Sequence, residues 1–159
     1  MERLESRKKD HIDLALTSQT GIPEMDRRFH YEPMLQSHPP EGLKPCTILG
    51  KEHRVPMWVS SMTGGTRMAG TINRNLAMAC NEFGMGMGLG SCRIIMDDDT
   101  YFEDFNMRKI IGDNLPLWAN LGIAQIEELV STDQVSRACR LVEKLRADGL
   151  IIHVNPMQE

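Results

Sequence analysis

The strongest constraint on the fold is an alternation of short apolar segments with longer segments of helical periodicity. The apolar segments, which we expect to be strands, are residues 55–60, 85–89, 115–120 and 150–154. A strand that is apolar on both faces is typical of a parallel sheet, whose connections are helices. The alternation therefore predicts an α/β fold, and both a doubly wound sheet and a (β/α)8 barrel satisfy it.

The segments between these strands predict the helices. Residues 66–83 carry apolar side chains at helical spacing, and Gly84 is a natural C-terminal cap. Residues 131–147 give the clearest helical pattern, in which Ser131 and Gln134 form a capping box at the start. We also expect an N-terminal helix over residues 4–20, a small hairpin over 46–55, and one or two short helices over 98–111.

Polar residues decide between the two architectures. Small or polar residues follow every expected strand, in segments 60–65, 90–93, 120–122 and 153–159. A doubly wound sheet concentrates its site at one switch point, whereas a barrel uses the end of every strand. We therefore expect a (β/α)8 TIM barrel. A full barrel needs about 250 residues, so this chain of 159 residues would hold only about the first four β/α units.

The expected organisation has two parts. Residues 1–54 would form an N-terminal helix, an irregular lead-in and a small hairpin. Residues 55–159 would form the first half of a barrel, truncated after its fourth strand. Four strands leave two unpaired sheet edges, so we expect self-association into a homo-oligomer. For the same reason, the 159-residue chain is expected to be inactive as an enzyme by itself.

Composition excludes several classes of function. The net charge is −4 and the basic block at residues 7–9 stands alone, which argues against nucleic-acid binding. No apolar run approaches the roughly 18 residues of a membrane span, and the charged N-terminus is unlike a signal peptide. The four cysteines form no C-x-x-C pair, which predicts reduced thiols and a cytoplasmic protein.

Glycine alternates with other residues over 84–90 and so strips one face of the expected strand of side chains. Such a strand is weakened by roughly 0.5–1 kcal/mol per glycine. A bare face suits a planar cofactor, and the alternative is tight packing of a helix on the strand. The Met62-Thr63-Gly64-Gly65 segment is equally open to two interpretations, a tight turn or a backbone approach to a flat ligand or an anion.

Residues 153–159 bring together an imidazole, two carboxamides and a carboxylate where the fourth strand stops. The carboxylate of Glu159 suits Mg²⁺, and its alternative is a solvent-exposed chain end. Arg7, Lys8 and His11 lie within about one helical turn, which is the usual spacing of a solvated basic face. With Arg93 they could also surround a diphosphate.

The ordered set of these motifs resembles the type 2 isopentenyl-diphosphate isomerase family, through Arg7-Lys8-x-x-His11, Met62-Thr63-Gly64-Gly65, Gly88-Leu89-Gly90-Ser91-x-Arg93, Asn120-Leu121-Gly122 and His153-x-Asn155-Pro156-Met157-Gln158-Glu159. The resemblance implies a flavoprotein (β/α)8 barrel that interconverts isopentenyl and dimethylallyl diphosphate in isoprenoid biosynthesis. It also implies reduced FMN, NADPH and Mg²⁺ as cofactors. This chain would match the N-terminal half of such a protein.

The same resemblance implies roles for individual residues. Those that would hold the substrate are Arg7, Lys8, His11, Ser91, Cys92, Arg93, His153, Asn155 and Gln158. Those that would line the FMN are Ser61, Met62, Thr63, Gly64, Ser91 and Asn120. Gln158 and His153 would act in catalysis, with Gln158 near the double bond, and Glu159 would ligate Mg²⁺. Cys92 departs from the family, because many members carry Gln there.

Two other functions fit parts of the pattern. An FMN-dependent oxidoreductase of the 2-hydroxy-acid oxidase type would keep the barrel and the flavin. Such an oxidase needs no Mg²⁺-diphosphate site. Residues 7–11 and 158–159 indicate such a site and therefore distinguish the two functions. The third interpretation is an inactive half-barrel fragment. We expect the isomerase, because a cofactor that moves a proton would replace the carboxylate pair that the sequence lacks.

Overall fold

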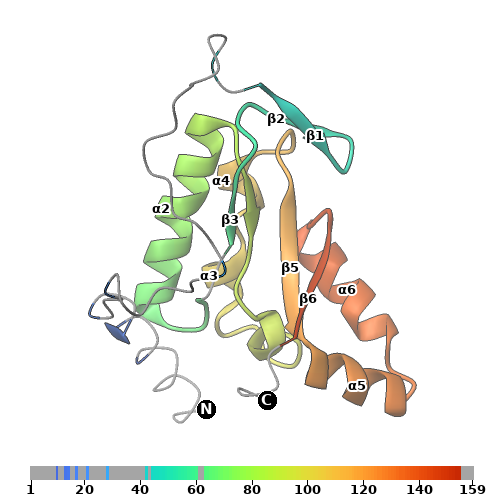
Figure 1. Ribbon diagram of the computed structural model, residues 1–159. Coiled ribbons are helices and arrows are strands. Elements are labelled where there is room, and N and C mark those ends of the chain that lie inside the picture. The colour runs from blue at the N-terminus through green and yellow to red at the C-terminus, as the bar shows by residue number, and fades with distance from the viewer. Residues whose placement is uncertain are drawn as a thin grey trace.

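Four parallel strands form the centre of the protein in the computed structural model (Figure 1). The structure describes residues 10, 13, 14, 17, 21, 28, 42, 44–60 and 63–154. The strands are β3 (Trp58–Ser60), β4 (Gly86–Gly88), β5 (Leu117–Gly122) and β6 (Gly149–His153), and they pair in that order. The four apolar segments thus form parallel strands as the alternation predicts, although β3 and β4 are each only three residues long.

Helices connect these strands. The connections are α2 (Arg67–Phe83), the 3-10 turn η2 (Cys92–Ile95), α3 (Phe102–Phe105), α4 (Arg108–Ile111), α5 (Ile123–Ser131) and α6 (Ser136–Leu145). Among the described residues, no helix is long and apolar enough to cross a membrane. Asp10, Asp13, Leu14 and Thr17 are helical, and the rest of the helix expected over 4–20 lies outside the described residues.

Helix α2 confirms the prediction for residues 66–83. Thr66 precedes the helix in an extended conformation, and its hydroxyl accepts a hydrogen bond from the Ala69 amide at 3.1 Å. Gly84 ends the helix in the left-handed region, with φ of 70°.

The prediction of one helix over 131–147 is wrong at its start. Ser131 ends α5, and α6 begins only at Ser136. Between them, Asp133 adopts a positive φ of 55°, which breaks the helical path. The expected capping box is therefore absent, because Ser131 donates its hydroxyl to Glu128 O in the preceding helix.

The hairpin expected over residues 46–55 is confirmed. Strands β1 (Cys46–Ile48) and β2 (Lys51–His53) are antiparallel. Leu49 and Gly50 form the two-residue turn, with φ values of 52° and 74°. Positive φ at both positions matches the turn twist that hairpins favour.

The expected fold class, half of a (β/α)8 barrel, is corrected by the sheet itself. The described residues form an open parallel sheet in which β3 and β6 are edges, accompanied by a separate two-stranded antiparallel sheet. This is a small mixed α/β fold, and no pairing within the described residues closes the sheet.

The two faces of the sheet differ in composition. One face contributes Met87, Leu117, Ala119 and Leu121 to a core shared with the helices. The register places a different set on the other face, which we call the tryptophan face: Trp58, Ser60, Gly86, Gly88, Trp118, Asn120, Gly149, Ile151 and His153. Trp58 and Trp118 meet there edge to face, with ring centroids 5.9 Å apart. One face is thus a helix-covered core, whereas the other carries polar side chains at one end.

An ionic network centred on buried Arg108 ties the loops at the end of the sheet where the strands begin. Arg108 donates to Asp148 Oδ2 at 2.7 Å and to the carbonyl oxygens of Arg146, Gly112 and Leu115 at 2.8, 2.7 and 2.9 Å. Asp148 also accepts from Lys51 Nζ at 2.6 Å and from the Leu117 amide at 2.9 Å. The network therefore fixes the segments before β5 and β6 at the end of the sheet opposite the expected site.

Candidate functional site

The polar side chains predicted to act together lie where the parallel strands end. Asn120 is on β5 and His153 is on the neighbouring β6, and the register puts both on the tryptophan face. The Oδ1 atom of Asn120 lies 2.7 Å from Nδ1 of His153. Asn120 is only 9% exposed and His153 is half-buried. The structure thus brings together one expected cofactor residue and one expected catalytic residue.

Thr63 and Gly64 follow β3 at the same end of the sheet as Asn120 and His153, and both are buried. The Thr63 hydroxyl has no hydrogen-bond partner among the described residues. A Cβ on Gly64 would collide with the ring of Phe105. A Cβ on Gly90, which follows β4, would come within 2.7 Å of the Thr63 amide nitrogen. Glycine is therefore needed at both places, at Gly90 because the backbones after β3 and β4 pack closely and at Gly64 because the Phe105 ring fills the space.

Ser91, Cys92 and Arg93 follow β4 and separate in the structure. Ser91 is half-buried and precedes η2. Cys92 is fully buried in the core, and its thiol donates to Gly90 O at 3.2 Å. The substrate role expected for Cys92 stays a prediction, although the structure buries its side chain completely. Arg93 is exposed and lines a cavity of about 200 Å³ beside α5, whose lining includes neither Asn120 nor His153.

The bare face of the glycine-rich strand is filled by the protein's own side chains. A Cβ on Gly86 would lie 2.8 Å from His53 Cε1 and 2.9 Å from the Trp118 ring, and one on Gly88 would lie 2.9 Å from Ile151 Cδ1. The glycines therefore make room for side chains of β2, β5 and β6. Neither a planar cofactor nor a helix explains the alternation at these two positions.

The remaining expected site residues lie outside the described residues. They are Arg7, Lys8, His11, Ser61, Met62, Asn155, Gln158 and Glu159. In the part of the chain that the structure describes, no group of three or more His, Cys, Asp and Glu side chains could hold a metal ion. The Mg²⁺ ligand expected at Glu159 therefore stays a prediction.

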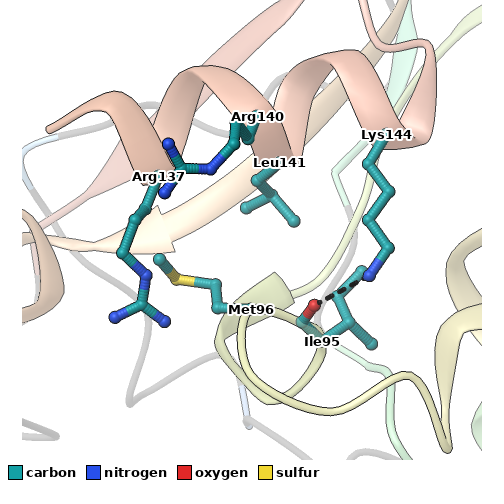
Figure 2. A pocket seen from close by; sticks show the side chains of 6 residues that line it. All are labelled: Ile95, Met96, Arg137, Arg140, Leu141 and Lys144. Carbon is teal, nitrogen blue, oxygen red and sulfur yellow. Dashed lines mark hydrogen bonds between the residues drawn. The ribbon is translucent and has the colours of Figure 1, made fainter. Parts of the chain in front are cut away.

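A cavity of about 230 Å³ lies beside α6, and Figure 2 shows the side chains that line it. Arg137, Arg140 and Lys144 of α6 line it, opposite Ile95 and Met96. Its cations already have partners: Arg137 and Lys144 pair with the exposed carboxylates of Asp97 and Asp99, and Arg140 donates to Ser136 Oγ at 3.1 Å. No expected site residue lines this cavity, so the strand ends stay the candidate site.

One residue that supports the site was not predicted from the sequence. Asn73 is fully buried in α2, where its amide nitrogen donates to Asp104 O at 2.9 Å and contacts Thr63 O at 3.4 Å. It thereby fastens the segment after β3. The signal was available, since Asn73 falls between Ala69 and Ala77 at i, i+4 spacing on the buried face of the helix.

Comparison with known proteins gives one consistent set of relatives. No family model matches the chain. The chain is similar to proteins named isopentenyl-diphosphate delta-isomerase, with 37% identity over 166 residues to that of Cronobacter sakazakii, covering 99% of this chain and 46% of the relative. Identity is 34% over 161 residues to the Mycolicibacterium vanbaalenii protein and 35% over 163 residues to the Deinococcus radiodurans protein, each covering 98% of this chain and 46% of the relative.

These relatives also correct the narrower resemblance. The chain spans about half the length of the curated relatives it matches. Their names state the isomerase and give neither a type nor a flavin, so the assignment to the FMN-dependent type 2 family is replaced by the broader similarity to isopentenyl-diphosphate delta-isomerases. The names do not favour the oxidoreductase alternative.

Proposed function

We propose that this protein takes part in the interconversion of isopentenyl and dimethylallyl diphosphate. The observation that carries the proposal is the Asn120–His153 pair on the tryptophan face, at the end of a parallel sheet where ligands of α/β folds bind. Its support from comparison is 37% identity over 99% of the chain to a protein named for this reaction.

The reaction moves a carbon–carbon double bond without changing the atoms of the substrate. A proton is added at one carbon, and another proton is removed from a second carbon. The catalyst must therefore hold the diphosphate still and keep a proton carrier beside the hydrocarbon. His153 is the titratable side chain that the described residues place at the site. We assign it to orienting the substrate, together with Asn155 and Gln158, whose roles rest on sequence alone.

We also propose FMN, NADPH and Mg²⁺ as cofactors. The buried Thr63 hydroxyl fits an FMN site, because a polar atom of a bound cofactor would supply the partner that the described residues do not. Thr63, Gly64, Ser91 and Asn120 are the described residues that would hold the FMN. When reduced and bound, FMN would supply the group that carries the proton. For Mg²⁺ the expected ligand is Glu159.

The proposal is tested by assaying the protein with isopentenyl diphosphate, FMN, NADPH and Mg²⁺ and measuring dimethylallyl diphosphate. We expect His153→Gln to lower kcat/KM at least about tenfold, which corresponds to about 1.4 kcal/mol of transition-state stabilisation. Cys139→Ser is the control, because Cys139 is exposed on α6 and unbridged.

The assay separates the reaction from its cofactors. The 159-residue chain is expected to be inactive by itself, so the assay uses the protein at its natural full length, and no turnover there with all components would contradict the proposed isomerase. Full turnover without FMN would agree with the proposed isomerase reaction but refute the proposal that FMN is its cofactor. If kcat/KM fell equally in His153→Gln and Cys139→Ser, His153 would have no specific role in the reaction.

A further inference from the structure

We propose that Asn120 is a positioning residue that sets the tautomer of His153. Asn120 Oδ1 lies 2.7 Å from His153 Nδ1, which is the length of a short hydrogen bond. A carboxamide oxygen can only accept, so Nδ1 must carry the proton that is shared. The neutral ring is then held with its proton on Nδ1 and its lone pair on Nε2.

The backbone makes this arrangement rigid. Both residues lie within paired strands, where Asn120 is opposite Ile151 and Gly122 is opposite His153. Asn120 and His153 therefore project from the same face, one pleat apart on adjacent strands. The ring is held at its Cα by the strand and at Nδ1 by Asn120, and these two points fix the direction of Nε2. Because Asn120 is only 9% exposed, water competes poorly for its amide oxygen.

The tautomer has a consequence for the proposed isomerase. Asn120 stabilises only the two forms of the ring that carry a proton on Nδ1. In the neutral form Nε2 accepts a hydrogen bond, and in the cationic form Nε2 donates one. His153 can thus hydrogen-bond a substrate oxygen through Nε2 only as an imidazolium. This step rests on the proposed function, whereas the tautomer itself does not.

The experiment is nitrogen NMR on protein labelled with ¹⁵N-histidine, at a pH high enough for the ring to be neutral. The His153 signals are identified by their loss in His153→Gln. We expect a protonated Nδ1 and an unprotonated Nε2 in the wild type. Asn120→Asp should keep that pattern, because a carboxylate also only accepts. Asn120→Leu should shift the ring toward the Nε2–H tautomer, which free histidine prefers in water.

Asn75→Leu is the matched control, because Asn75 is exposed on α2 and the same replacement there should leave the His153 signals unchanged. A wild-type ring protonated on Nε2 would overturn the proposal, since the Asn120 amide would then present its NH2 group to Nδ1. An unchanged tautomer in folded Asn120→Leu would overturn it as well. If Asn120→Leu fails to fold, the wild-type and Asn120→Asp spectra still decide.

Kinetics then separate this inference from the proposed function. FMN is kept at saturation, so that its proposed contact with Asn120 does not limit turnover. If both hold, Asn120→Leu and His153→Gln then each lower turnover, and the double variant loses no more than His153→Gln alone, because one residue acts through the other. Independent, multiplying losses would contradict positioning. The expected spectra, together with no isomerase turnover in the full-length protein, would support the positioning role and refute the function.

Discussion

Replacing Arg108 with methionine should destabilise the protein more than any exposed ionic substitution. The Arg108 side chain is 2% exposed and makes four hydrogen bonds of 2.7–2.9 Å. Methionine matches the hydrocarbon stem but provides no donor. Asp148 and three carbonyl groups, those of Arg146, Gly112 and Leu115, would lose their charged partner together.

The size of the effect follows from these losses. Removing one partner of a buried ion pair costs about 3–5 kcal/mol. Asp148 would keep its hydrogen bonds from Lys51 and from the Leu117 amide, so the cost should stay within that range. Such a loss is a large part of the roughly 5–15 kcal/mol that stabilises a typical domain. With a urea slope of about 2 kcal/mol per molar, the unfolding midpoint should fall by about 2 M.

Urea unfolding monitored by circular dichroism measures this shift. Lys51→Met is the matched control, because it removes the more exposed partner of the same carboxylate and should cost only about 0–1 kcal/mol. Arg108→Lys keeps the charge without the planar fork and should fall between the two. A midpoint for Arg108→Met equal to that of Lys51→Met would refute the assignment of the network as a main source of stability.

Three further outcomes are expected. Burial opposes ionisation of Asp148, but its hydrogen bonds outweigh burial and lower its pKa in the folded protein. The ionised carboxylate therefore stabilises the fold above the unfolded pKa of about 3.9, and this stabilisation is lost as pH falls through the folded pKa. In Asp148→Asn the free energy of unfolding should consequently depend less on pH in the acid range. Gly90→Ala should cost about 1–3 kcal/mol in urea unfolding, whereas Gly149→Ala, whose Cβ has 3.5 Å of clearance, should cost little. Burial raises the pKa of the Cys80 thiol to about 11, so iodoacetamide at pH 8 should modify exposed Cys139 first, as peptide mass spectrometry would show.

The sequence predicts the elements of this fold better than their exact limits. The four strands are recognisable because apolar runs are long enough to be buried on both faces. The break between α5 and α6 was missed because Ser131 and Gln134 match a capping box by spacing alone. The apolar side chains of Ile123, Ile126 and Leu129 recur every third residue, and this spacing indicates a separate helix at the position of α5.

The candidate site could be predicted only as a set of strand ends. A single sequence does not contain strand register, and a slip of one residue turns every side chain to the opposite face. The contact between Asn120 and His153 therefore needed the structure. The same holds for Cys92, whose place after a strand suggests a binding residue although its thiol lies in the core.

The pairing of Trp58 with Trp118 determines what the protein's intrinsic fluorescence can report. These are the two tryptophans of the chain, and they lie on one face of the sheet, with Trp58 53% exposed and Trp118 nearly buried. Emission excited at the indole band therefore comes from this face, while the helix-covered core contributes no indole. A quencher such as iodide should reach Trp58 and spare Trp118. A molecule that settles against the sheet should shield Trp58 and change the signal, which gives a label-free optical readout of occupancy at that surface.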